Sequence, residues 1–266
     1  MTISLEYNNI YLNQLTQKNV MSYLIEYYRS KVFELIDKVY SEELKGILDA
    51  SKIMADCVKK NNLIYAFGAG HSMALALEIF YRAGGLPQIY PMLDLSVSAY
   101  NGATKSTSIE KLHGYARVLI DYYGVKEGSV LIVVSNSGNR VLPVEAAVEA
   151  RSRGAKVIAI TSKEYSKSLP AENPYGKKLY EVADITIDNK MPPGDAVVDV
   201  KGLPVKVAPV STIVNSFIMQ SLVIATVDEL IKSGVRPMIW MSAHLPGGEE
   251  ANKRIMAEYF GRIKPL

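Results

Sequence analysis

Five consecutive aliphatic residues, from Val130 to Val134, place the strongest constraint on the fold of this chain. A short apolar run without polar alternation is typical of a strand buried on both faces, as the strands of parallel sheets are. Four further short apolar segments predict strands at 63–67, 88–93, 156–160 and 183–187. Because stretches with helical spacing separate most of them, we predict an α/β fold, a three-layer αβα sandwich with a mostly parallel, doubly wound sheet.

The remaining segments predict the helices and connections around that sheet. Two helices are expected over 17–60, and others at about 72–83, 108–123 and from 140 to 153. Polar or Pro/Gly-rich composition predicts loops at 94–108 and 192–209, and helical spacing predicts helices at 211–232 and 249–260. No linker is evident. We therefore expect a single domain over 1–266, with its core at about 31–214 between N-terminal helices (17–60) and C-terminal helices (211–260).

Composition excludes several classes of protein. Of the 266 residues, 48% are hydrophobic and 21% are charged, as in folded globular proteins. The net charge of +3 is spread along the sequence, so we expect no nucleic-acid or membrane partner. The single cysteine, Cys57, excludes an intrachain disulfide and a cysteine-based zinc site, and we expect neither a metal nor a cofactor. Because we find no signal-peptide pattern and no apolar run of about 18 residues, we expect a cytoplasmic protein.

The loop Gly68-Ala69-Gly70-His71-Ser72 follows the first predicted strand and precedes a helix. Glycines let the backbone approach a ligand, and unpaired N–H groups at a helix start attract anions. Gly70 and Ser72 are therefore candidate phosphate-binding residues; the alternative for Ser72 is to cap the helix. A dinucleotide site is the weaker alternative: Asp94 would bind the ribose, but Met73 replaces the third glycine of that fingerprint.

A second polar loop, Ser135-Asn136-Ser137-Gly138-Asn139, follows the most apolar strand. Its hydroxyl, amide and backbone donors suit a nest around a phosphate group. An ordinary turn with a helix cap is the alternative, but it needs fewer polar side chains. A third candidate pair, Ser211-Thr212, opens the long helix, where capping requires one hydroxyl and leaves the other for a ligand.

These motifs together resemble the SIS (sugar isomerase) domain. The resemblance rests on Gly68-x-Gly70-x-Ser72, on Ser135-x-Ser137-Gly138-Asn139 and on a helix starting near Ser211-Thr212. The stretches GAGHS, EIFYRAGG and SNSGNR, with GDA at 194–196 and MSA at 241–243, are similar to uncharacterised phosphosugar-binding SIS proteins that resemble phosphoheptose isomerases. The resemblance covers about residues 20–260.

The resemblance implies a sugar phosphate ligand. The serine-rich loop (Ser135, Asn136, Ser137, Gly138 and Asn139) would hold the phosphate, with Gly70 and Ser72 on the neighbouring wall. Many relatives have a threonine where this chain has Asn139, which predicts a different phosphate coordination. The resemblance also implies an aldose–ketose isomerase with glutamate and histidine as acid and base, and a homo-oligomer, either a dimer or a tetramer.

Our candidates for the acid–base residues are His71, Glu78 and Glu110. Each has a plainer interpretation: His71 packs or caps, Glu78 pairs with Arg82 four residues on, and Glu110 forms a capping box with Thr107. His113 falls within a predicted helix, whereas His244 and Asp195 lie in loops. Two other functions stay open, a non-catalytic phosphosugar sensor and a lyase or etherase acting on an N-acetylated sugar phosphate.

Overall fold

The protein is described from a computed structural model, which defines the backbone of residues 3–266 and the side chains of residues 22–266. Its centre is a five-stranded sheet with the order β2-β1-β3-β4-β5, and all neighbouring strands are parallel. The strands are β1 (Ile64–Gly68), β2 (Ile89–Pro91), β3 (Val130–Val134), β4 (Lys156–Thr161) and β5 (Ile185–Asp188). The predicted doubly wound α/β architecture is confirmed.

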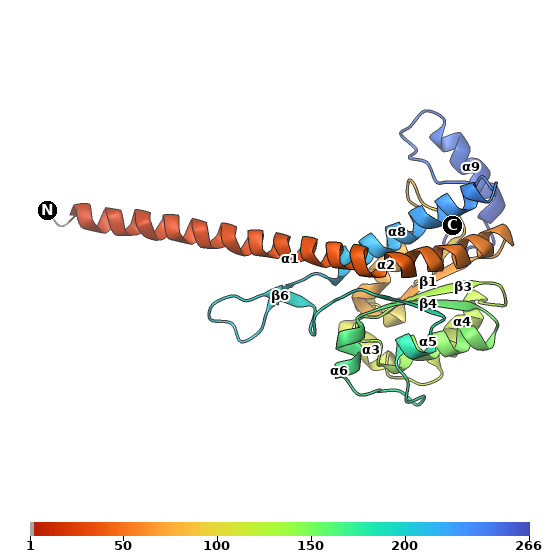
Figure 1. The fold of residues 1–266 in the computed structure, drawn as a ribbon, viewed down its shortest axis with the longest axis horizontal. Coiled ribbons are helices and arrows are strands. Elements are labelled where there is room, and N and C mark those ends of the chain that lie inside the picture. Colours follow the sequence, from red (N-terminus) through yellow and green to blue (C-terminus); the bar gives the residue numbers. More distant parts are fainter. Residues whose placement is uncertain (1–2) are drawn as a thin grey trace.

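Helices cover both faces of this sheet (Figure 1). The helices are α1 (Ile3–Lys59), α2 (Met73–Glu78), α3 (Ala103–Ile109), α4 (Tyr115–Tyr123), α5 (Val141–Ser152), α6 (Lys163–Ser168), α7 (Leu179–Val182), α8 (Ser211–Lys232) and α9 (Gly248–Tyr259). Alternate residues of β1 point to opposite faces: Ile64 and Ala66 pack with α1, α2 and α8, whereas Tyr65 and Phe67 pack with α4, α5 and α7. Both halves of the core are therefore buried against helices.

The expectation of two helices over 17–60 is wrong, because α1 runs without a break from Ile3 to Lys59. No proline interrupts this stretch, and its one glycine, Gly46, lies where α1 passes β5. A Cβ at Gly46 would lie 4.0 Å from the Ile187 side chain, an ordinary van der Waals distance, so the packing of α1 on β5 does not require glycine here. Helix α1 crosses the sheet and continues past its edge (Figure 1).

Several connections are more ordered than expected. The predicted loop 94–108 contains two 3₁₀ turns and most of α3, and the predicted helix 108–123 begins only at Tyr115, after Gly114 with φ of 90°. The predicted helix 72–83 ends at Glu78. Within 192–209, the antiparallel strands β6 (Ala196–Val198) and β7 (Val207–Pro209) form a hairpin.

Helix α8 is the one helix, among the described residues, that is long and apolar enough to cross a membrane by length and composition. From the sequence, no apolar run of this length was expected. In its most apolar window, 44% of the residues are buried, and α8 packs beside α1 on the sheet. A core helix passes the same test of length and composition, so this finding is weak evidence for a membrane span.

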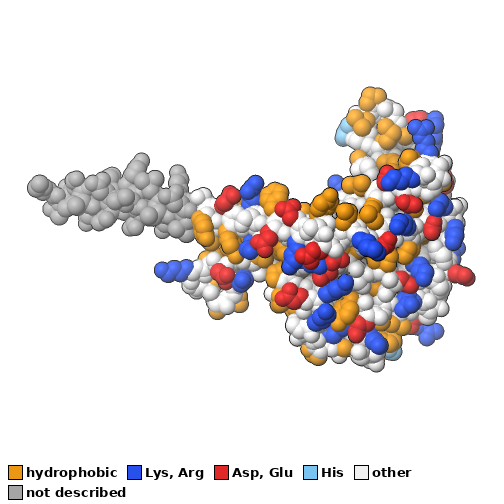
Figure 2. Space-filling view, viewed as in Figure 1, with side chains coloured by type: hydrophobic (Ala, Val, Ile, Leu, Met, Phe, Trp, Pro, Cys, Tyr) orange, Lys and Arg blue, Asp and Glu red, His pale blue; other side chains and the backbone are white. Residues whose placement is uncertain are grey.

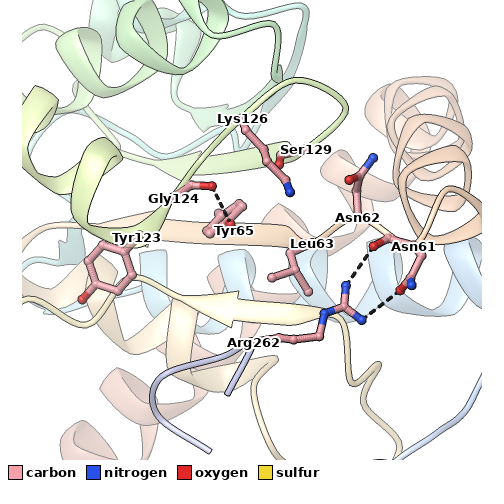
Figure 3. Close-up of a pocket in the computed structure, with 9 residues that line it drawn as sticks. All are labelled: Asn61, Asn62, Leu63, Tyr65, Tyr123, Gly124, Lys126, Ser129 and Arg262. Carbon is pink, nitrogen blue, oxygen red and sulfur yellow. Dashed lines mark hydrogen bonds between the residues drawn. The ribbon is translucent and has the colours of Figure 1, made fainter. Parts of the chain in front are cut away.

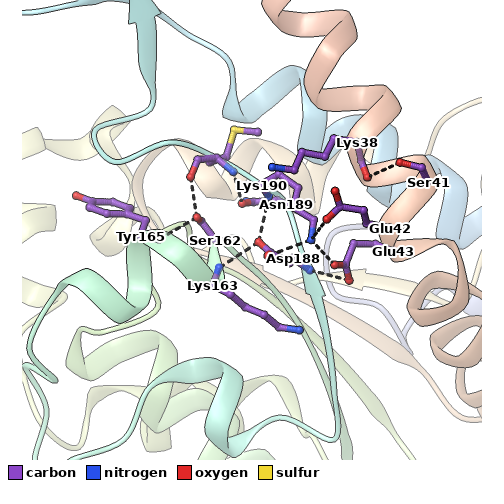
Figure 4. A network of polar contacts seen from close by, with 11 residues as sticks. Lys38, Ser41, Glu42, Glu43, Ser162, Lys163, Tyr165, Asp188, Asn189 and Lys190 are labelled. Carbon is purple, nitrogen blue, oxygen red and sulfur yellow. Dashed lines mark hydrogen bonds and ion pairs between the residues drawn. The ribbon is translucent and has the colours of Figure 1, made fainter.

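A charged cluster ties α1 to the end of β5 (Figure 4). The Lys190 ammonium lies 2.6 Å from Glu43, 3.0 Å from Glu42 and 3.2 Å from Asp188, and the Lys190 side chain is only 11% exposed. Burial lowers the pKa of Lys190, but the hydrogen bonds to Glu43 and Glu42 and the charge of Asp188 outweigh that effect and raise it. One cation is thus shared by three carboxylates at this junction.

Replacing Lys190 by methionine is expected to lower the free energy of unfolding by about 3 kcal/mol, because the carboxylates lose their buried counter-ion. The control is Lys232→Met, which breaks an exposed pair with Asp228 and should cost less than about 1 kcal/mol. Urea denaturation followed by circular dichroism measures both. Equal losses in the two variants would contradict a structural role for the cluster.

Candidate functional site

A cavity of about 220 Å³ opens at the carboxyl ends of β1 and β3. The chain reverses its direction of travel across the sheet between these two strands, which is where ligands bind in open α/β sheets. The cavity is lined by Ala69, Ser72, Glu110, Val134, Ser135, Asn136, Ser137, Arg140, Pro143 and Tyr165. It therefore joins the two loops singled out in the sequence.

The loop after β3 folds back on itself. The Gly138 N–H donates to the Ser135 hydroxyl at 3.2 Å, whereas the Ser137 hydroxyl has no partner in the described part of the chain. Gly138 has φ of 53°, and a Cβ there would lie 2.7 Å from the Thr161 hydroxyl oxygen. This position therefore requires glycine, and the turn leaves Ser137 available to a ligand.

Asn136 anchors the loop to two other elements. Its side-chain oxygen accepts from Asn189 at 2.8 Å and from Asn215 at 3.3 Å, and both of these amides are buried. Its carbonyl oxygen accepts from the Ser162 N–H at 3.0 Å and the Thr161 hydroxyl at 3.2 Å. The Asn136 carboxamide oxygen is thus occupied within the protein, which fixes the backbone beside Ser135 and Ser137.

The loop after β1 is held close to the start of α2. A Cβ at Gly68 would lie 2.5 Å from the Ser72 carbonyl oxygen, so the close turn requires glycine. The Ser72 side chain makes no capping hydrogen bond and lines the cavity. Gly70 has φ of 57°, and a Cβ there would lie 3.8 Å from Glu110, so this loop also faces the glutamate.

Glu110 and Arg140 meet at the cavity wall. Glu110 ends α3, and its carboxylate lies 3.4 Å from the Arg140 guanidinium. The Glu110 carbonyl oxygen accepts from the Leu142 N–H at 3.1 Å, which fixes α3 against the start of α5. Burial raises the pKa of Glu110, and the charge and hydrogen bond of Arg140 partly oppose the rise. A carboxyl group with a raised pKa is suited to proton transfer near neutral pH.

The capping-box interpretation of Glu110 is wrong. Thr107 lies inside α3 and donates its hydroxyl proton to the Ala103 carbonyl oxygen at 3.0 Å, while Glu110 is at the other end of the helix. The interpretation of Glu78 as a paired residue is confirmed: it forms an ion pair with Arg82 and accepts from the Gln220 amide at 3.1 Å. Glu78 does not line the cavity.

Six other candidates also lie outside the cavity lining: Gly70 and Gly138, which shape the two loops, and His71, Asn139, Ser211 and Thr212. His71 is exposed, and Asn139 is 2% exposed, with its amide donating to the Pro170 carbonyl oxygen at 3.2 Å. At the start of α8, Asp195 accepts from the Ser211 N–H at 2.8 Å and the Ser211 hydroxyl at 2.5 Å. Thr212 is exposed. Asn139 and Ser211 thus serve internal contacts rather than the cavity.

Sequence reasoning missed Arg140 and Tyr165. Arg140 follows the serine-rich loop directly, so its position after SNSGN was the available signal. Tyr165 comes from α6, which was not predicted, and it projects away from the Lys190 cluster (Figure 4). The Ser162 hydroxyl fixes the start of α6 by accepting from the Tyr165 N–H at 3.2 Å.

Comparison with known proteins identifies related sequences. The family model of the SIS domain matches residues 27–162. A UPF0309 protein of Oceanobacillus iheyensis is 38% identical over 247 residues, which is 91% of this chain and 99% of the relative; the values for one from Shouchella clausii are the same. A solved phosphoheptose isomerase from Francisella tularensis is 16% identical, with a TM-score of 0.49 over 76% of this chain and 95% of that one.

The close packing at Gly138 predicts a specific cost for substitution. Gly138→Ala should lower the free energy of unfolding by about 1–3 kcal/mol more than Gly176→Ala, because overpacking adds to backbone strain. Gly176 is a matched control: its φ is 60°, but nothing lies within 4 Å of a Cβ there. Chemical denaturation of both variants measures the difference. Equal costs would show that the loop yields to the added methyl group.

Proposed function

The chain belongs to the SIS domain family, together with the UPF0309 proteins, and on that premise we propose that its cavity binds the phosphate group of a sugar phosphate. The unpartnered Ser137 hydroxyl and the Arg140 guanidinium, both at the cavity wall, support this proposal. Hydroxyl and guanidinium donors form charge-assisted hydrogen bonds to phosphate, each contributing about 1.5–3 kcal/mol. Ser135 and Ser72 complete a polar wall around them.

We further propose that the bound sugar undergoes aldose–ketose isomerisation with Glu110 as the base. The Glu110 carboxylate removes the C2 proton of the open-chain aldose and returns it to C1, while the O2 proton moves to O1. The partly buried carboxyl group of Glu110, which lines the cavity between the two loops, is the observation that carries this proposal. A tuned carboxylate contributes typically 10²–10⁴-fold to such a proton transfer.

Binding without catalysis is the second candidate function. None of the three histidines lies among the residues that line the cavity within the described chain. His113 is 60% exposed and lies 3.4 Å from the buried Glu145, on the side of α5. A sensor needs the phosphate contacts but no second acid–base group, so this arrangement also supports a sensor.

The partner we propose is a second copy of the chain, which forms a dimer or a tetramer through α1 and α8. Large apolar side chains are exposed on both helices, among them Phe33, Tyr40, Leu48, Ile224 and Ile231. Figure 2 shows hydrophobic side chains gathered where α8 runs beside α1. Contiguous exposed apolar surface of this kind is typical of protein–protein interfaces. We also propose that the chain forms a single domain, with α1 and α8 on its flanks.

Proton NMR in D₂O with a pooled panel of sugar phosphates tests the function. The panel includes heptose, hexose, pentose, amino and N-acetylated forms. An isomerase is expected to exchange the C2 proton and produce a new sugar signal, whereas a sensor broadens ligand lines without exchange. Loss of a C3 substituent would instead identify a lyase. Glu110→Gln should retain line broadening and lose exchange; exchange that survives in Glu110→Gln would overturn the assignment of the base.

Ser137→Ala in the same experiment is expected to weaken binding about tenfold, because one donor to the phosphate is lost. Ser152→Ala is the control, since its hydroxyl donates to the Glu149 carbonyl oxygen on the exposed side of α5. Equal affinity of both variants for every panel member would contradict a phosphate contact at Ser137.

The pH profile tests the pairing of Glu110 with Arg140. Because the base must be deprotonated, kcat/KM should fall as pH decreases through the pKa of Glu110. Arg140→Gln removes the charge that holds this pKa down, so the acid limb should move to higher pH. Arg151→Gln, whose guanidinium lies 3.6 Å from Asp184, should leave the limb in place. An unmoved limb in Arg140→Gln would refute the coupling.

A further inference from the structure

A second cavity, of about 270 Å³, lies at the opposite edge of the sheet (Figure 3). It is bounded by the residues after α1, the loop from α4 to β3, and the C-terminal segment around Arg262. Leu63 and Ser129 immediately precede β1 and β3, the same strands whose far ends form the first cavity. Each strand is five residues long, which separates the two cavities by about 15 Å.

Ser129, Asn62 and Lys126 are among the polar side chains at this cavity that have no hydrogen-bond partner within the described part of the chain. Ser129 is the most informative because it is 1% exposed and its hydroxyl is fully buried. An unmade hydrogen bond at a buried hydroxyl costs about 1–3 kcal/mol, which a ligand atom can recover. Lys126 also lines the cavity, and Figure 3 shows its side chain among the other lining residues.

The charges around the cavity define which ligand suits it. Helices α1 and α4 end here, so their last carbonyl groups carry partial negative charge. Two cations lie at these helix ends: Arg262 donates to the Asn61 carbonyl oxygen, two residues beyond α1, at 2.8 Å, and Lys264 donates to the Tyr122 carbonyl oxygen in the last turn of α4 at 2.7 Å. The Lys126 ammonium has no carbonyl oxygen as a hydrogen-bond partner within the described chain. No carboxylate of that part of the chain lines the cavity.

We propose that this cavity is a second binding site for a small oxyanion, either a phosphate or a carboxylate group. Lys126 supplies the opposite charge, Ser129 and Asn62 donate hydrogen bonds, and Leu63 with the Tyr65 ring forms an apolar wall for the rest of the ligand. The Tyr65 hydroxyl is occupied, since it donates to the Gly124 carbonyl oxygen at 3.1 Å. This site does not depend on the function proposed for the first cavity.

The test uses inorganic phosphate and malonate as probes, titrated separately by isothermal calorimetry. The protein carries Ser137→Ala and Arg140→Gln, so that binding at the first cavity is suppressed. At least one probe is expected to bind, and Lys126→Ala or Ser129→Ala should weaken that binding tenfold or more. Phosphate binding alone identifies a phosphate site, and malonate binding alone identifies a carboxylate site. Lys232→Ala, which removes an exposed lysine elsewhere, should leave affinity unchanged.

Thermal unfolding provides an independent readout that also establishes folding. Without a probe, Ser129→Ala should be at least as stable as its parent, because it removes an unpartnered buried hydroxyl. With the probe, the parent should gain more stability than the Ser129→Ala protein. The proposal is overturned if neither probe binds, or if binding is unchanged in both Lys126→Ala and Ser129→Ala.

Discussion

The parallel pairing of β1 with β3 is the constraint on which the rest of the structure depends. After β1 the chain adds β2 on one side, and then crosses back to add β3, β4 and β5 on the other. Parallel strands place their carboxyl ends at one edge, so the loops after β1 and β3 must diverge to opposite faces of the sheet. The cavity between them, and the meeting of Ser72 with Ser137, follow from that divergence.

A buried amide network then makes the crevice rigid. Asn136 after β3, Asn189 after β5 and Asn215 within α8 bond to one another at 2.8–3.3 Å. In a low-dielectric interior such bonds are strong, and breaking one leaves an unsatisfied buried group. The serine-rich loop is therefore ordered before a ligand arrives, which reduces the entropy cost of binding. The glycine at Gly138 serves the same end, because a larger residue would displace the turn.

The sequence predicted the features set by local pattern and missed those set by distant partners. Continuous apolar runs located all five strands of the sheet, and the loop positions after β1 and β3 located Ser72, Ser135 and Ser137. Asn139 and Ser211 carry the same local signals, yet their side chains bond to Pro170 and Asp195, which lie 31 and 16 residues away along the chain. Capping and ligand binding use identical residue types, so only tertiary contacts separate them. The hairpin β6–β7 was missed because proline and glycine are frequent in 192–209, a composition that predicts a loop.

The chemistry that Glu110 can perform is narrower than that of a glutamate–histidine pair. One carboxylate suffices for the proton transfer itself, because it takes the proton from C2 and delivers it to C1 on the same face of the enediol. Ring opening is a separate step that needs an acid at the ring oxygen and a base at the anomeric hydroxyl. Arg140 is always protonated, so it serves neither as the acid at the ring oxygen nor as the base at the anomeric hydroxyl. Burial raises the pKa of Glu110 toward the range where one group alternates between acid and base. If the proposed function holds, a site built on these two residues suits sugar phosphates that reach the open-chain form readily. The demand for a second acid–base group grows with the stability of the ring.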